Sequence, residues 1–133
     1  MKLSLVVPCY NEADNVALFQ QAVVSAFDGC GYDYEIVYID DGSRDATLHN
    51  LKKLHASGQC PVQVISFSRN FGKEASIFAG LNAARGACCV VIDCDLQHPP
   101  EVIPQMYRLW QDGYEVVEGV KSSRGRESLA YRL

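Results

Sequence analysis

The stretch VVIDCDLQHPP, residues 90–100, joins an apolar run to a group of polar side chains. In an extended backbone, alternate side chains point the same way. One face is therefore expected to carry three oxygen-bearing side chains: Asp93, Asp95 and Gln97. Cys94 and Leu96 are then expected to turn towards the protein. Two carboxylates and an amide oxygen suit Mg²⁺ or Mn²⁺, which complete their coordination with water and substrate phosphates. The alternative is a polar loop whose carboxylates form turns or cap a helix.

The composition limits the class of protein. A chain of 133 residues corresponds to about one domain, and 48% hydrophobic and 21% charged residues are ordinary for a soluble globular protein. A formal net charge of -4 argues against nucleic acid as the main partner. Six cysteines without a Cys-x-x-Cys pair indicate a reducing, cytoplasmic setting rather than a disulfide framework or a zinc site. No apolar run approaches the ~20 residues of a membrane helix, so any membrane anchor is expected outside this chain.

Strand and helix patterns alternate along the chain. Short apolar runs predict strands at residues 3–7, 34–39, 62–67, 87–92 and 114–120. Helical patterns separate them, and the basic tail is expected to start a further helix. In the helix that follows residue 73, the apolar residues are Ile77, Phe78, Leu81 and Ala84. This alternation predicts an α/β fold with a doubly wound, mainly parallel sheet and helices on both faces.

The polar clusters follow the strands at their carboxyl ends. In a doubly wound sheet, ligands bind beyond these ends, where the strand order reverses. With an order of 3-2-1-4, residues 8–12 and 93–97 meet at the reversal, flanked by Asp40 and Asp41. Neither Gly-x-Gly-x-x-Gly nor Gly-x-x-x-x-Gly-Lys-[Ser/Thr] occurs, so neither a dinucleotide enzyme nor a P-loop enzyme is favoured. The sequence therefore predicts an active-site crevice at this edge of the sheet.

Basic residues on loops near the predicted crevice have two interpretations. They are Arg69, Lys73, Lys121 and Arg124. Together with a divalent ion they could offset the charge of a diphosphate. Alternatively, they are solvated surface residues without a ligand.

Four motifs carry a resemblance to a known family: VVPCYNE (6–12), DDGS (40–43), SRNFGKE (68–74) and DCDLQHPP (93–100). Together they are similar to glycosyltransferase family 2, and the resemblance covers essentially the whole chain. The fit is closest to the polyprenyl-phosphate branch, which includes the dolichyl-phosphate mannose synthases and the bactoprenol glucosyltransferases. The resemblance implies a GT-A type, nucleotide-diphospho-sugar transferase-like fold. It also implies a metal-dependent transfer that inverts the anomeric carbon.

The resemblance implies roles for residues at the nucleoside. Pro8, Tyr10 and Glu12 would line a nucleoside pocket, and Asp41 would hydrogen-bond the base of a nucleoside-diphosphate sugar donor. Asp41→Asn would then weaken nucleotide binding and leave the stability almost unchanged.

The remaining implied roles concern the metal and the diphosphate. Asp93, Asp95 and Gln97 would hold Mg²⁺ or Mn²⁺, and the two aspartates are the residues to which catalysis is assigned. Lys121 and Arg124 would contact the phosphates, although the branch usually has Arg at the position of Lys121, which weakens a bidentate grip. A polyprenyl phosphate acceptor is already an anion and needs no strong general base, whereas a sugar hydroxyl would need one.

The family's catalytic domain is markedly longer than this chain. Residues 1–133 are therefore expected to be the donor-binding part of a hexosyltransferase, truncated at the C-terminal side, with the acceptor part largely absent. The full-length protein is expected to act at the cytoplasmic face of the membrane in cell envelope glycan biosynthesis, on a polyprenyl phosphate or a glycan acceptor. Two other functions stay open: a non-catalytic nucleotide-sugar-binding module and a sugar-phosphate nucleotidyltransferase.

Overall fold

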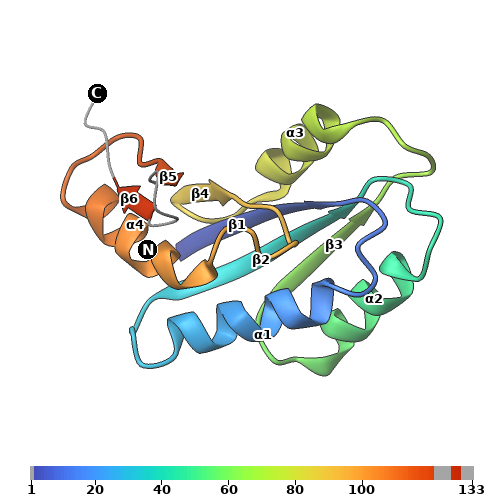
Figure 1. Cartoon of the computed structure of the whole chain (residues 1–133), viewed down its shortest axis with the longest axis horizontal. Helices are drawn as coiled ribbons and strands as arrows, with labels where there is room; N and C mark the ends of the chain where they lie inside the picture. The colour runs from blue at the N-terminus through green and yellow to red at the C-terminus, as the bar shows by residue number, and fades with distance from the viewer. Residues whose placement is uncertain (1, 122–126, 130–133) are drawn as a thin grey trace.

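A four-stranded parallel sheet forms the centre of the structure, a computed structural model that describes residues 2–121 and 127–129. The strands stand in the order β3-β2-β1-β4 (Figure 1). They are β1 (Lys2–Cys9), β2 (Asp33–Asp40), β3 (Val62–Ser66) and β4 (Cys88–Val91). The predicted order 3-2-1-4 and the predicted parallel pairing are both confirmed.

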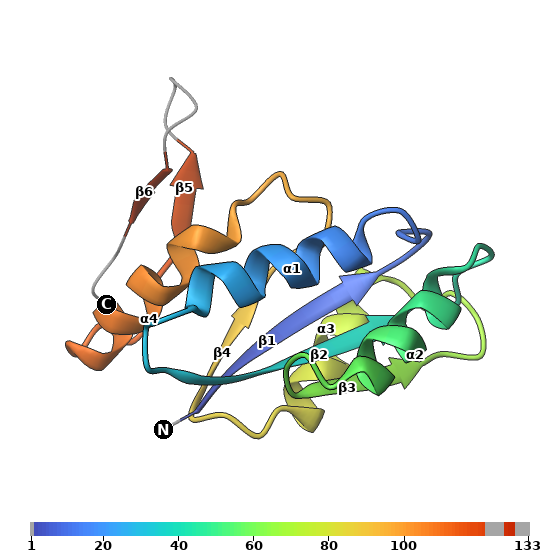
Figure 2. The same ribbon diagram turned by 90° about the horizontal axis from the view of Figure 1, so that it is seen from below.

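Helices cover both faces of the sheet, as predicted. They are α1 (Val16–Phe27), α2 (Thr47–Ser57), α3 (Lys73–Ala83), the short 3-10 helix η1 (Pro100–Val102) and α4 (Ile103–Gln111). The first, second and fourth α-helices pack on one face, and α3 packs on the other (Figure 2). In the described part of the chain, no helix has both the length and the apolar character needed to span a bilayer.

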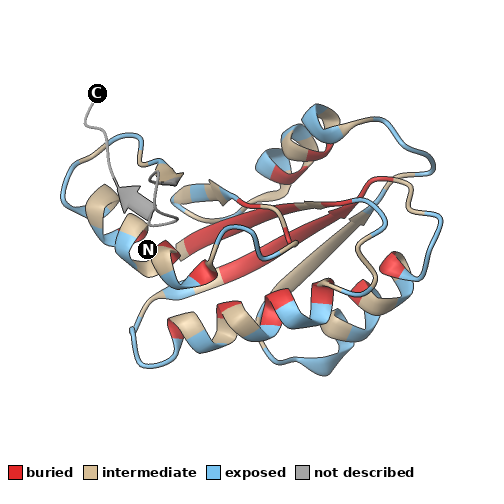
Figure 3. Cartoon of the chain, in the orientation of Figure 1, coloured by how far each residue is buried: buried red, intermediate tan, exposed pale blue. Residues whose placement is uncertain are grey.

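β1 lies between β2 and β4 and pairs with both in parallel. Its register sets Cys9 opposite Asp40 and Val6 opposite Val91. The larger core, under α1, α2 and α4, receives Leu3, Leu5 and Val7. The smaller core, under α3, receives Val6 from the opposite face of the strand. Figure 3 shows the result as a buried band along β1 and β2.

α3 packs on the sheet through small residues rather than through the apolar residues that the sequence suggested. Ser76 and Gly80 are buried, whereas Phe78 is 70% exposed and Leu81 is 44% exposed. A Cβ atom on Gly80 would lie 2.4 Å from Cγ1 of Val6, so the helix backbone approaches the sheet too closely for a larger side chain. Close approach, and not apolar periodicity, therefore decides which face of α3 is buried.

The C-terminal part differs from the prediction in two ways. The expected fifth strand at residues 114–120 is only the short β5 (Gly119–Lys121), and it pairs antiparallel with β6 (Glu127–Leu129) in a separate two-stranded sheet. The helix expected in the basic tail is wrong at residues 127–129, which form β6. Glu115 and Glu118 interrupt the apolar run of the expected strand, so that run lacks a continuous face to bury in the main sheet.

A buried carboxylate ties the α3–β4 connection to the sheet. Glu35 of β2 accepts hydrogen bonds from Oγ of Ser4 at 2.7 Å, from the backbone N–H of Arg85 at 2.6 Å and from Nε2 of Gln63 at 3.0 Å. Burial raises the pKa of Glu35, but these hydrogen bonds outweigh burial and hold the pKa below its ordinary value of 4.5. The ionised form is therefore the one that the fold stabilises.

We predict that Glu35→Gln lowers the free energy of unfolding by about 1–3 kcal/mol at neutral pH, because the new amide sets N–H donors against the N–H donors of Gln63. A carboxylate whose pKa is lower in the folded state stabilises the fold above its unfolded pKa and loses that contribution as the pH falls through the folded pKa. The difference between wild type and variant should thus be largest near neutral pH and should shrink below the ordinary value of 4.5. Urea denaturation across this pH range measures both effects.

The exposed Glu101→Gln provides a matched control, and its stability should follow that of the wild type. A loss for Glu35→Gln that stays constant with pH would contradict the assignment, since it would show that the charge of Glu35 plays no part.

Candidate functional site

Two neighbouring pockets share Lys73 and Asp93: the smaller lies at the carboxyl end of the sheet, where the crevice was predicted, and the larger lies along β4. The smaller, of about 230 Å³, is formed by the segments after β1, β2 and β4 together with the start of α3. Six of its lining residues are ones to which the family resemblance assigns a role: Pro8, Tyr10, Glu12, Asp41, Asp93 and Asp95. The residues predicted to contact a nucleoside and the two aspartates are therefore brought together in one pocket.

The segment after β1 is fixed by hydrogen bonds to the segment after β2. Asn11 has a left-handed backbone with φ 53°, and its N–H donates to Oγ of Ser43 at 2.9 Å. The backbone N–H of Glu12 donates to Oγ1 of Thr47 at 2.9 Å. These bonds leave the ring of Tyr10 on the surface of the pocket, 42% exposed. The roles of Ser43 and Thr47 were not predicted from the sequence, because both hydroxyl groups position the backbone and do not line the pocket themselves.

Asp41 fixes a second loop. Its side chain is buried, and its carboxylate accepts hydrogen bonds from the N–H of Phe71 at 2.7 Å, from the N–H of Gly72 at 3.1 Å and from Nδ2 of Asn70 at 3.0 Å. A carboxylate offers about four acceptor positions, so these three donors leave about one position for a ligand. These hydrogen bonds argue against the expectation that Asp41→Asn leaves the stability almost unchanged.

Gly42 allows this loop to come close. Its φ of 66° is left-handed, and a Cβ atom on it would lie 2.2 Å from the carbonyl carbon of Arg69. Only glycine accommodates both the backbone angle and the contact. The DDGS motif thus combines a carboxylate that holds residues 70–72 with a glycine that makes room for them.

The turn after β4 departs from the extended backbone that the sequence suggested. Asp93 and Asp95 both line the smaller pocket, and Cys94 is buried as predicted. Leu96, however, is 37% exposed and has a left-handed φ of 64°, so the expectation that it turns inward is wrong. The N–H of Gln97 donates to Oδ1 of Asp95 at 3.1 Å and closes a tight turn. This turn ends the strict alternation of side chains.

As a result, Gln97 is exposed and lies outside the residues that line the smaller pocket. Its role as a metal ligand stays a prediction. Lys121 lies in β5, and Arg124 lies outside the described residues. Their predicted phosphate contacts likewise stay predictions.

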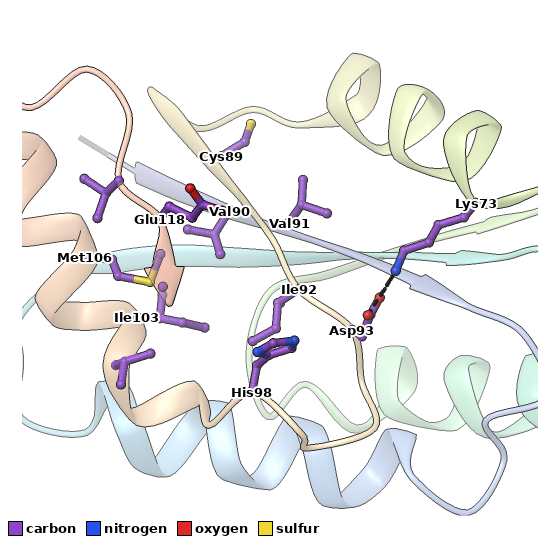
Figure 4. Close-up of a pocket in the computed structure, with 13 residues that line it drawn as sticks. Lys73, Cys89, Val90, Val91, Ile92, Asp93, His98, Ile103, Met106 and Glu118 are labelled. Carbon is purple, nitrogen blue, oxygen red and sulfur yellow. Dashed lines mark hydrogen bonds and ion pairs between the residues drawn. The ribbon is translucent and has the colours of Figure 1, made fainter. Parts of the chain in front are cut away.

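Lys73 stands between the two pockets and lines both of them. Its Nζ lies 2.8 Å from Oδ1 and 3.0 Å from Oδ2 of Asp93 (Figure 4). The larger pocket, of about 410 Å³, lies between β4, α4 and the segment before β5. Its walls combine polar side chains, among them His98 and Glu118, with apolar ones that include Val90, Ile92, Ile103, Met106 and Val117. Lys73 was one of the basic residues for which the sequence left phosphate contact and simple solvation open.

Two buried thiols form the floor of the smaller pocket. Sγ of Cys9 lies 3.8 Å from Sγ of Cys94, and both side chains are 1% exposed. The hydrogen bond with Cys94, followed by burial, raises the pKa of Cys9 well above its ordinary value of 9.0. The thiol of Cys9 is therefore expected to stay neutral at physiological pH, and both cysteine side chains contribute to packing.

A divalent ion would rely on the two aspartates. Among residues 2–120, no three His, Cys, Asp or Glu side chains group closely enough to hold a metal ion by themselves. Asp93 and Asp95 nevertheless lie on the same pocket and are each partly exposed, which leaves room for water and phosphate oxygens. Mg²⁺ and Mn²⁺ are commonly held by one or two carboxylates in this way, so the donor set fits such an ion.

Comparison with known proteins identifies relatives that match nearly the whole length of this chain. A "Prophage bactoprenol glucosyl transferase homolog" of Escherichia coli (strain K12) is 43% identical over 127 residues, covering 96% of this chain and 41% of the relative. The "Bactoprenol glucosyl transferase" of Shigella phage SfV is also 43% identical over 127 residues, with the same coverage of 96% and 41%. This chain thus spans about two fifths of the length of these relatives.

The fold is shared with solved glycosyltransferases. The mannosyltransferase PcManGT from Pyrobaculum calidifontis, in complex with GDP-Man and Mn²⁺, superposes with a TM-score of 0.77 at 20% identity, covering 92% of this chain and 36% of that one. This likeness confirms the predicted GT-A type fold. Residues 4–133 match the family described as Glycosyl transferase family 2. The chain therefore belongs to glycosyltransferase family 2, the family that its four sequence motifs resemble.

Proposed function

We propose that this chain is the donor-binding part of a hexosyltransferase that moves a sugar from a nucleoside-diphosphate sugar to a polyprenyl phosphate, with inversion at the anomeric carbon. The observation that carries the proposal is the smaller pocket, in which Tyr10 and Asp41 lie beside Asp93 and Asp95. The names of the Escherichia coli and phage relatives support a polyprenyl acceptor, and the complex of the Pyrobaculum enzyme supports a nucleotide-sugar donor.

The nucleoside is assigned to the wall formed by the segments after β1 and β2. The exposed ring of Tyr10 offers an apolar face on which a base can stack. Asp41 keeps about one acceptor position for a donor group of the base. Pro8 and Glu12 complete this wall.

The diphosphate is assigned to the side of the pocket that carries Asp93 and Asp95. These two aspartates would hold Mg²⁺ or Mn²⁺, with Gln97 as a third ligand, and the bound ion would stabilise the negative charge that develops on the leaving diphosphate. Lys121 and Arg124 are proposed as phosphate contacts from the segment that begins with β5.

The acceptor is assigned mainly to other parts of the protein. This chain spans about two fifths of its relatives, and we place most acceptor contacts in segments that the longer relatives have in addition. A polyprenyl phosphate places the reaction at a membrane surface, and the reduced cysteines predicted from the sequence suggest its cytoplasmic face. The family match argues against a nucleotidyltransferase. A non-catalytic donor-binding module is the second candidate, because the residues grouped in the smaller pocket are ones assigned to the donor and the ion.

We predict that UDP or GDP raises the Tm of the 133-residue chain, and raises it further when Mn²⁺ is present. Binding at about a hundred times Kd adds about 2.7 kcal/mol to the free energy of unfolding. A gain of that size corresponds to several degrees in Tm for a domain of this length. Thermal-shift measurement with each nucleoside diphosphate, with and without Mn²⁺, tests the prediction.

Inorganic pyrophosphate with Mn²⁺ is the control, because it lacks the nucleoside and should give a smaller shift. If no nucleoside diphosphate changes the Tm of a chain that is demonstrably folded, the proposal of donor binding fails.

We predict that Asp95→Asn removes most of the Mn²⁺ enhancement of nucleoside diphosphate binding while weak, metal-independent binding remains. The amide keeps an oxygen that can accept the N–H of Gln97, so the turn is preserved while the charge that attracts the ion is lost. Calorimetric titration of UDP or GDP with and without Mn²⁺ measures the enhancement.

Asp28→Asn, at an exposed position after α1, removes the same charge away from both pockets and should behave as the wild type. Full metal enhancement in the Asp95→Asn protein would rule out Asp95 as a metal ligand.

We predict that Asp41→Asn lowers both the stability of the chain without ligand, by about 1–3 kcal/mol, and the affinity for nucleoside diphosphate. The amide has one acceptor oxygen where the carboxylate has two, so at least one of the three N–H groups that now donate to Asp41 loses its partner. Urea denaturation measures the first loss, and titration at a temperature where both proteins are folded measures the second. A loss of stability with unchanged affinity would leave Asp41 a structural role alone.

A further inference from the structure

Lys73 and Asp93 form an ion pair at the junction of the two pockets (Figure 4). Of the described residues that line the smaller pocket, Lys73 alone has a basic side chain, whereas Glu12, Asp41, Asp93 and Asp95 are acidic. A diphosphate that enters this pocket therefore meets four carboxylates and one ammonium group. Lys73 is thus the one cationic side chain within the described lining of this pocket that can contact a phosphate oxygen.

The backbone of Lys73 is fixed, but its ammonium group is free to move. The preceding residue, Gly72, donates its N–H to the carboxylate of Asp41, so the start of α3 is held in place. The side chain of Lys73 is 60% exposed and that of Asp93 is 35% exposed. Ion pairs of this exposure are weak, and a lysine side chain is flexible along its four-carbon stem. The ammonium group can therefore leave Asp93 without disturbing the fold.

A divalent ion on Asp93 would compete with this ammonium group. With Nζ at 2.8 Å from Oδ1 of Asp93, an ion bound to the same carboxylate would place two positive charges within a few ångströms of each other. Their repulsion disfavours simultaneous occupation of the carboxylate. The two cations therefore compete for the carboxylate.

We propose that Lys73 is a positioning residue that exchanges with the divalent ion. Its ammonium group neutralises Asp93 before the ion binds, and on binding it moves to a phosphate oxygen of the donor. The second half of this inference rests on the proposed function. The first half, the competition between Lys73 and the ion for Asp93, rests on the ion pair alone.

Lys73→Met tests the exchange because it removes the ammonium group and keeps a side chain that favours the helix. Titration of the protein with Mn²⁺ alone should show an affinity about two- to fivefold higher than in the wild type, the range expected from the strength of exposed ion pairs. Lys73→Arg should show an affinity equal to or lower than the wild type, since a guanidinium group can hold both oxygens of Asp93 at once.

The matched control is Lys53→Met on α2, where the lysine is exposed and lines neither pocket. It removes the same net charge, so a long-range effect of charge would appear in both variants. An Mn²⁺ affinity of Lys73→Met that equals that of Lys53→Met, or falls below the wild type, would overturn the exchange.

The phosphate contact is measured separately with UDP or GDP in saturating Mn²⁺. Lys73→Met should bind the nucleoside diphosphate about tenfold more weakly than Lys53→Met, as expected for the loss of one charge-assisted hydrogen bond. The exchange therefore predicts opposite changes in the two affinities, which a structural role for Lys73 would not produce. Equal nucleotide affinities in the two variants would overturn the phosphate contact. Absence of nucleotide binding in the wild type would instead count against the proposed function, and the Mn²⁺ titration would still decide the exchange.

Discussion

The parallel pairing of β1 with both β2 and β4 is the constraint on which the site depends. β1 has hydrogen-bonded neighbours along both edges and core side chains on both faces. A shift of one residue would turn every one of those side chains to the wrong face. The three strands therefore end side by side. Cys9 and Cys94, 85 positions apart in sequence, place their sulfur atoms 3.8 Å apart beneath the smaller pocket.

This constraint explains which features the sequence predicted. Parallel order brings the carboxyl ends together whatever the side chains are, so the residues after β1, β2 and β4 could be grouped from pattern alone. The left-handed turn at Leu96 could not, because nothing in a polar and apolar alternation indicates a positive φ at a leucine. Nor could the buried face of α3, where a close helix–sheet approach selects Gly80 over the larger apolar residues. The position of Lys73 on Asp93 depends on that same helix placement.

The carboxylates of the smaller pocket all have partners before any ligand is considered. Oε2 of Glu12 accepts from Nδ2 of Asn15 at 2.6 Å, and Oδ1 of Asp95 accepts the N–H of Gln97. Asp41 holds the loop that precedes α3, and Asp93 pairs with Lys73. Hydrogen bonds to the ionised form allow such like charges to sit together, since each bond offsets part of the desolvation and of the mutual repulsion. The folded protein can therefore accommodate these four carboxylates without a bound ligand.

The kind of partner then decides which carboxylate a ligand can reach. Asp41 is held by backbone N–H groups, which can leave only if the loop itself opens. Asp93 is held by an ammonium group on a flexible and largely exposed stem, which can leave while the backbone stays in place. The end of the pocket at Asp41 is therefore rigid, which suits recognition of a ligand's shape. The end at Asp93 has a carboxylate whose partner can be exchanged, which suits binding of a cation. A nucleoside diphosphate has the same division, with a rigid base at one end and mobile charge at the other, and this match links the fold to the chemistry proposed for it.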